Sequence, residues 1–175
     1  NNKKISNLSD FSDSFLVPHH LHKMLSKYIV LAETEKSLMV LRPYQYHATE
    51  KIISTIENSI NNGYVWHTTG SGKTLTSFKA SQILMDNPEV FKVVFVVDRR
   101  DLDFQTTKEF NNFSDGSVDG TDNTKALVKQ FGDDTKLIVT TIQKLNNAIG
   151  SSRYEDTMTH LQDKRIVFIF DECHR

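Results

Sequence analysis

The sequence has a single cysteine, no long apolar run and no excess of charge of either sign. One cysteine, Cys173, cannot form a disulfide within the chain, so we expect a reducing compartment, the cytoplasm. No segment approaches the roughly 18 apolar residues of a membrane-spanning helix, and residues 1–10 are polar, which predicts a soluble protein without a membrane partner. Because 21 basic residues face 22 acidic ones, any contact with nucleic acid must be local.

The 175 residues, 38% of them hydrophobic, are enough for one main domain and hardly for two. Residues 1–17 are rich in Asn, Ser and Asp without a helical or strand period, which predicts a connector. Apolar residues spaced by three and four from Pro18 onward predict a short amphipathic helix. We therefore expect residues 1–40 to be a connector with one short helix, and residues 41–175 to form the domain.

Within that domain, helices and strands alternate. A helix starts near Pro43, a favourable first-turn residue, and ends at Gly63. Its expected apolar stripe consists of Ile52, Ile53, Ile56 and Ile60. The strands expected after it span residues 64–67, 92–97, 137–140 and 165–170, and the helices span 74–85, 102–110, 125–131 and 143–149. Strands that are apolar on both faces and are followed by helices predict an α/β fold, with a mostly parallel sheet and helices on both faces.

A glycine-rich segment, residues 67–74, lies between an expected strand and an expected helix, as a phosphate-binding loop must. Gly70 and Gly72 let backbone N–H groups turn toward a phosphate, and the helix adds its positive N-terminal end. Lys73 would neutralise the β- and γ-phosphates of ATP, and the Thr74 hydroxyl would bind Mg²⁺. His67 stands where a glycine is usual. The expected nucleotide contacts in the loop are Thr69, Gly70, Ser71, Gly72, Lys73 and Thr74.

An apolar strand ends in Asp171 and Glu172, at the strand edge where open α/β sheets bind ligands. We expect Asp171 to bind Mg²⁺ and Glu172 to act as the base that polarises water. Such an acidic pair by itself is more often the start of a loop, and the phosphate loop upstream makes the catalytic interpretation the stronger one. Cys173 and His174 also suggest a thiol protease, but the acidic pair already explains the site.

Several motifs together resemble those of superfamily-two helicases and translocases. These are Leu41–Gln45, Thr69–Thr74, Val97–Leu102, Thr140–Leu145 and Asp171–His174, in the order of that superfamily. The resemblance implies that Arg42 and Gln45 bind the nucleotide, with Gln45 hydrogen-bonded to the adenine. It also implies that Arg99, Arg100, Thr141 and Lys144 contact the DNA backbone. From the residues alone, the three cations could equally be solvated charges at helix starts.

The amino-acid sequences of these motifs, over residues 41–175, resemble more closely those of the motor and restriction subunit of type I restriction endonucleases. That resemblance implies a RecA-like P-loop domain, the first of two motor lobes, which uses ATP and Mg²⁺ to translocate duplex DNA. It implies assembly with methylation and specificity subunits, and DNA cleavage by a nuclease domain that residues 1–40 do not contain. The alternatives are a strand-separating helicase, a type III restriction subunit or a nucleotide-gated binding module.

Overall fold

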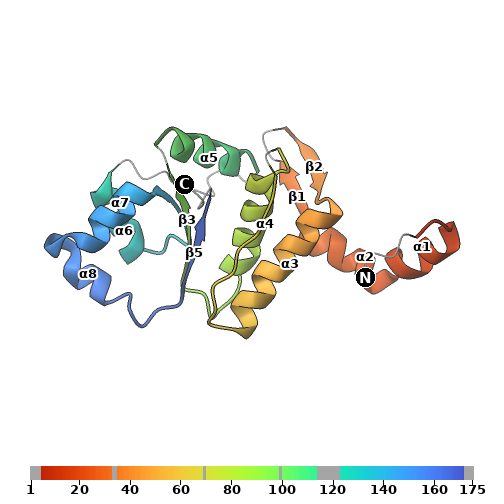
Figure 1. The fold of residues 1–175 in the computed structure, drawn as a ribbon, viewed down its shortest axis with the longest axis horizontal. Coiled ribbons are helices and arrows are strands. Elements are labelled where there is room, and N and C mark those ends of the chain that lie inside the picture. The colour runs from red at the N-terminus through yellow and green to blue at the C-terminus, as the bar shows by residue number, and fades with distance from the viewer. Residues whose placement is uncertain (1–4, 33–34, 69, 99, 114–122, 172–175) are drawn as a thin grey trace.

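The computed structural model describes residues 5–32, 35–68, 70–98, 100–113 and 123–171. Figure 1 shows a central sheet with helices on both sides and a helical N-terminal extension. In chain order the helices and strands are α1 (Leu8–Phe15), α2 (Pro18–Lys23), the π-helical turn η1 (Met24–Tyr28), β1 (Ile29–Ala32), β2 (Ser37–Val40), α3 (Pro43–Asn58), α4 (Lys73–Met85), β3 (Lys92–Val97), α5 (Arg100–Phe113), α6 (Thr124–Gly132), β4 (Leu137–Thr141), α7 (Ile142–Gly150), the 3₁₀ turn η2 (Ser152–Tyr154), α8 (Glu155–Thr159) and β5 (Ile166–Phe170).

The central sheet has the strand order β4-β3-β5, and both pairings are parallel. Strand β3 lies in the middle, and all six of its residues are buried. A parallel strand with both faces covered needs apolar residues at every position, which the run of five apolar residues after Lys92 supplies. The predicted α/β fold with a parallel sheet is confirmed for these three strands.

Two separate cores cover the two faces of this sheet. Val93, Phe95 and Val97 face the core that also contains Phe78 of α4 and Phe110 of α5. The alternate residues of β3, Val94 and Val96, pack on the opposite face, against side chains of α6 and α7. Successive side chains of β3 point to opposite faces and so contact both cores. The sheet therefore lies between two layers of helices, as predicted.

The N-terminal part has more structure than the sequence predicted. The expected helix is present as α2 and η1, but residues 8–15, expected to be part of a connector, form α1. The Asn7 side chain accepts a hydrogen bond from the Ser9 N–H, 3.0 Å away, and so caps α1. Strands β1 and β2 form an antiparallel hairpin that was not predicted. No residue of α1 is buried. Leu8, Phe11 and Phe15 recur at helical spacing, a signal too short to have predicted the helix.

The predicted strand at residues 64–67 is wrong. These residues lie in neither sheet of the described chain, and Tyr64 and Trp66 are 87% and 86% exposed. Helix α3 ends at Asn58 rather than at Gly63, and the Ser59 N–H donates to the Thr55 carbonyl at that end. Ile60, expected on the buried stripe, is consequently fully exposed. The segment from residue 59 to the phosphate loop is therefore a connection without helix or strand.

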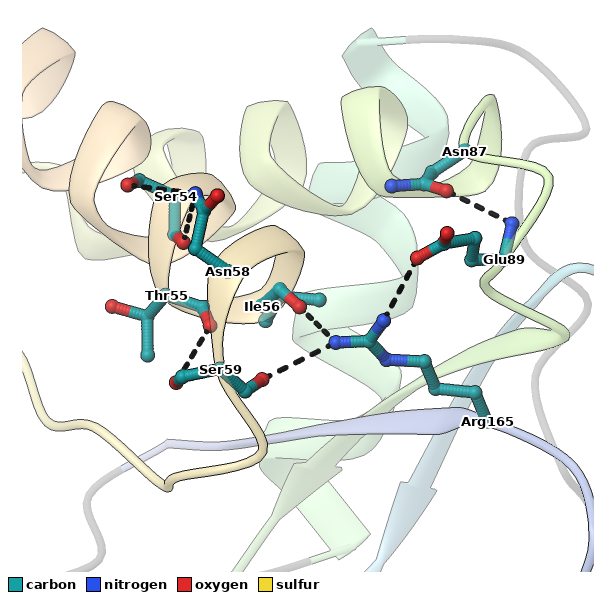
Figure 2. A network of polar contacts seen from close by, with 8 residues as sticks. All are labelled: Ser54, Thr55, Ile56, Asn58, Ser59, Asn87, Glu89 and Arg165. Atoms are coloured by element: carbon teal, nitrogen blue, oxygen red, sulfur yellow. Dashed lines mark hydrogen bonds and ion pairs between the residues drawn. The ribbon is translucent and has the colours of Figure 1, made fainter.

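Arg165 fastens the end of α3 to the start of the sheet, as Figure 2 shows. Its guanidinium donates to the carbonyls of Ile56 and Ser59 and pairs with Glu89 at 3.0 Å. The carbonyls at a helix end have no partner within the helix, so a cation there satisfies them and complements the helix dipole. The Arg165 carbonyl in turn accepts from the Phe91 N–H at 2.8 Å, beside β3.

Candidate nucleotide-binding site

The start of α4 lies at the edge of the sheet where the parallel strands end. A turn at residues 86–91 connects α4 to β3, so the helix and the strand run in opposite directions, side by side in Figure 1. The first residues of α4, Lys73 and Thr74, are therefore on the same edge as the residues that follow β3, β4 and β5. This is the edge at which α/β proteins bind ligands.

The loop before α4 has the backbone conformation that its two glycines permit. Gly70 and Gly72 have φ angles of 75° and 74°, in the left-handed region that disfavours other residues. Between them, Ser71 donates to the Thr68 carbonyl from its N–H at 3.2 Å and from its hydroxyl at 2.7 Å. The helix predicted at 74–85 is confirmed, beginning one residue earlier. The loop thus meets a helix start in the way that phosphate binding needs.

Helix α3 holds this loop from the other side. The Gln45 Oε1 accepts from the Arg42 N–H at 2.9 Å, and its Nε2 donates to the carbonyls of Ser71 and Gly72 at 3.1 and 3.2 Å. The Tyr44 hydroxyl donates to the same Ser71 carbonyl at 2.8 Å. These bonds do not test the predicted contact of Gln45 with adenine, but they show that its amide lies against the loop.

An open cavity of about 450 Å³ lies beside the loop. The residues that line it are Arg42, Tyr44, Trp66, His67, Thr68, Gly70 and Ser71. The sequence predicted Arg42, Gly70 and Ser71 as nucleotide contacts, and it did not predict Tyr44 or Trp66. Tyr44 lies inside the quoted segment Leu41–Gln45, which was the available signal. The rings of Tyr44 and His67 meet edge to face, with centroids 5.6 Å apart.

The predicted metal ligands occupy the same edge of the sheet. The Asp171 N–H donates to the Val96 carbonyl at 3.0 Å, which continues the β5 pairing to the end of β3. Thr74 is the second residue of α4 and is half-buried. Hydroxyl and carboxylate oxygens are ligands that Mg²⁺ prefers, so these two residue types fit that ion. Thr69 and Glu172 lie outside the described residues.

Two of the four predicted DNA contacts, Thr141 and Lys144, have side chains with little exposure. The Thr141 side chain is fully buried, and its hydroxyl accepts from the Lys144 N–H at 3.3 Å, capping α7. Lys144 itself is only 9% exposed, whereas Ile142 at the same helix start is exposed. Arg99 lies outside the described residues. Arg100 is the first residue of α5, and only its backbone is described. These assignments therefore stay predictions.

Residues 44–175 match the family model of the SWI2/SNF2 ATPase. That match puts the chain in a class of P-loop ATPases, in agreement with the loop geometry. Two relatives indicate a more specific family within these ATPases. A type I restriction enzyme endonuclease subunit of Staphylococcus saprophyticus is 53% identical over 175 residues, covering 99% of this chain. The C-terminal part of a putative type I restriction enzyme endonuclease subunit from Mycoplasma pneumoniae is 45% identical, covering 99% of this chain and 90% of its own length.

The chain belongs to the type I restriction enzyme endonuclease subunits. It spans 19% of the length of the staphylococcal relatives that it matches. The fold is similar to part of a Type ISP restriction-modification enzyme, LlaGI, solved as a nuclease-deletion mutant with a DNA substrate mimic. That similarity has a TM-score of 0.59 at 23% identity, and covers 78% of this chain and 15% of the other. In the described ranges, no helix is long and apolar enough to cross a membrane.

Proposed function

We propose that residues 41–175 are the first, RecA-like motor lobe of a type I restriction endonuclease subunit, which hydrolyses ATP to translocate duplex DNA. In this proposal the lobe works in the cytoplasm with methylation and specificity subunits, and a nuclease domain elsewhere in the full-length protein cleaves the DNA. The observation that carries the proposal is the phosphate loop, with two left-handed glycines directly before α4.

The loop and the start of α4 would hold the phosphates of ATP. Backbone N–H groups at a helix start attract anions, because they lack helical partners and lie at the positive end of the helix dipole. Lys73, the first residue of α4, would add a full positive charge on the β- and γ-phosphates. This positioned charge favours the transition state, in which negative charge shifts among the phosphate oxygens.

Thr74 and Asp171 would hold Mg²⁺, which neutralises phosphate charge when bound. Glu172, the residue after Asp171 in the sequence, is proposed to accept the proton of the attacking water. Thr74 and Asp171 come from two segments, α4 and the residue after β5, which lie at the same edge of the sheet.

Arg42 and Gln45 are proposed to bind the base side of the nucleotide. The cavity beside the loop has a volume within the roughly 300–1,000 Å³ typical of small-molecule sites. Its walls include the aromatic side chains of Tyr44 and Trp66, which offer flat apolar surfaces to a purine. These aromatic side chains therefore support a nucleotide rather than a small anion as the ligand.

Arg99, Arg100, Thr141 and Lys144 are proposed to contact DNA phosphates. Contacts of this kind carry no sequence information, which suits a motor that moves along any sequence. Because Thr141 caps α7 and Lys144 is nearly buried, their direct contact with DNA requires the start of α7 to rearrange.

The test is the DNA-stimulated ATPase rate of the full-length protein. We expect Lys73→Ala to abolish hydrolysis, because the phosphates lose their fixed counter-charge. The matched control is Lys51→Ala, which removes an exposed lysine from α3 and should leave the rate unchanged. Activity of Lys73→Ala within a few-fold of the wild type would refute the site. Absence of stimulation by DNA in the wild type would favour the nucleotide-gated module over a motor.

The two carboxylates can be separated in the same assay. Glu172→Gln should bind ATP almost normally and fail to turn it over, because an amide cannot accept the proton of water. Asp171→Asn should weaken Mg²⁺-dependent nucleotide binding. Equal losses of nucleotide affinity in both variants would show that the division of roles is wrong.

A further inference from the structure

Resting on the proposed translocation of DNA, we propose that a polar cavity at the C-terminal end of α7 binds a phosphate group of the DNA backbone. This α7 cavity has a volume of about 620 Å³ and lies in the helical layer formed by α6, α7 and η2. In Figure 1 that layer is on the side of the sheet away from α3 and α4. The cavity shares no described lining residue with the one beside the phosphate loop. Its lining includes Thr124, Asn146, Asn147, Gly150, Ser151 and Arg153.

The side chains around the α7 cavity are hydrogen-bond donors, and one of them carries a positive charge. The hydroxyls of Thr124 and Ser151 can each donate to a phosphate oxygen. The amides of Asn146 and Asn147 can do the same. Arg153 adds a planar guanidinium, whose N–H groups match two phosphate oxygens at once. These are the side-chain types with which proteins contact DNA phosphates independently of sequence.

Arg153 decides the electrostatic sign of the α7 cavity. The N-terminal end of α6 and the C-terminal end of α7 both border the cavity, so their opposite helix dipoles offset each other. Arg153 is exposed, and its guanidinium carbon lies 5.8 Å from the centroid of the Tyr154 ring, which packs on the core of this layer. The exposed acids Glu155 and Asp156 begin α8, and neither is among the described lining residues. The cavity therefore suits an anion.

The α7 cavity continues a polar stripe that starts at the predicted DNA motif. The first four residues of α7 belong to that motif, Thr140–Leu145, and the exposed residues Gln143, Asn146 and Asn147 share one face of the helix. An α-helix rises about 1.5 Å per residue, so Gly150 lies about 12 Å along the axis from the start of α7. The charges of duplex DNA are about 1.7 Å apart along its axis. A duplex at the start of α7 therefore has further phosphates within reach of the cavity.

Contact through this stripe needs no rearrangement of the fold. Thr141 is fully buried and Lys144 is 9% exposed, so their own contact with DNA requires the start of α7 to open. The stripe on α7 is already exposed. A protein partner fits the α7 cavity less well, because the core of a protein interface is apolar and poor in charge. The donors and the arginine favour the DNA backbone.

The experiment measures the affinity of the full-length protein for linear duplex DNA at several salt concentrations, without ATP. Each phosphate contact made by a cation changes the slope of log affinity against log salt by about 0.9, because counterions are released. Arg153→Ala should weaken DNA binding about tenfold and make this slope shallower by about one contact. The control Lys51→Ala removes an exposed cation from α3 and should change neither quantity.

Gly150 offers a second pair of variants that keeps the fold intact. It is the exposed last residue of α7, and a Cβ atom there would meet nothing within 4 Å. Gly150→Glu places a carboxylate at the α7 cavity and should weaken DNA binding at least as much as Arg153→Ala. Gly150→Ala should bind DNA like the wild type. All these variants should keep the ATP affinity of the wild type, because the nucleotide site is separate.

Loss of DNA affinity in Arg153→Ala and Gly150→Glu, with both controls unchanged, would support the site. Unchanged affinity and slope in Arg153→Ala, beside a wild type that binds DNA, would overturn it. Variants that bind DNA normally but assemble poorly with the methylation and specificity subunits would also overturn it, and would make the α7 cavity a protein interface. A wild type with neither DNA binding nor DNA-stimulated ATPase activity would instead refute the proposed function.

Discussion

Strand β3 and residues 60–67, which include the apolar residues Ile60, Tyr64, Val65 and Trp66, lie in opposite environments. In β3, five consecutive apolar residues are at most 2% exposed. In the second segment, Ile60, Tyr64 and Trp66 are the most exposed large hydrophobic residues of the described chain. Strand β3 has a parallel partner on each side, while the second segment has no strand beside it in either sheet.

Apolar character alone therefore does not make a strand. A strand needs neighbours for its N–H and C=O groups, because each unpaired buried group costs about as much as a lost hydrogen bond. Residues 64–67 lead to the phosphate loop without such neighbours, so their backbone remains outside the core. Three experiments test this contrast between the two segments and the elements that join them.

The largest effect is expected in β3. Phe95→Ala should destabilise the fold by about 3–5 kcal/mol, because Phe95 is buried against the ring of Phe110. Trp66→Ala, its control in the exposed segment, should change the free energy of unfolding by less than about 0.5 kcal/mol. Urea unfolding of both variants measures the two values. A comparable loss for Trp66→Ala would mean that the segment is packed in the protein, and the contrast would disappear.

An intermediate effect is expected where the exposed segment enters α4. Gly72→Ala should cost about 2–3 kcal/mol, combining left-handed strain with the clash against Gln45. Gly70→Ala carries only the strain and should cost about 1 kcal/mol. The double variant Gly72→Ala with Gln45→Ala should be less destabilised than the sum of its parts, because the clash is relieved. Strict additivity would contradict the close contact.

The smallest effect is expected at Arg165, which connects the end of α3 to the start of the sheet. Arg165→Met removes the bonds to the end of α3, where the exposed segment begins, and should cost about 1–2 kcal/mol. Lys51→Met on the exposed face of α3 is the matched control and should be close to neutral. Thermal unfolding compares the two. An unchanged stability of Arg165→Met would show that the network in Figure 2 contributes nothing measurable.

The sheet and its helices were predictable because their sequence signals are local. The strand at 92–97 agrees residue by residue, and the helices predicted at 74–85, 125–131 and 143–149 differ by only one residue at either end. Apolar runs, such as the five consecutive apolar residues of β3, and apolar residues at helical spacing produce these signals within a few residues of chain. The phosphate loop was predicted for the same reason, since glycines and a lysine at fixed spacing define it.

The contacts of the site were not predictable, because they join segments far apart in the sequence. Nothing in Leu41–Gln45 shows that Gln45 donates to the carbonyls of Ser71 and Gly72, or that Tyr44 reaches the same loop. The burial of Thr141 and Lys144 likewise depends on how α7 packs on the sheet. For such residues the motif suggests a role, and the environment decides whether the side chain is available for it.

Local sequence patterns were sufficient to specify the parallel sheet, the helices around it and the position of the phosphate loop. Hydrophobic period and glycine spacing act over short stretches of chain, so they do not depend on the rest of the fold. Tertiary packing, in contrast, keeps residues 64–67 outside the sheet and brings Gln45 against the loop. Both outcomes depend on which backbone groups find partners, and those partners come from segments that meet only when the chain folds.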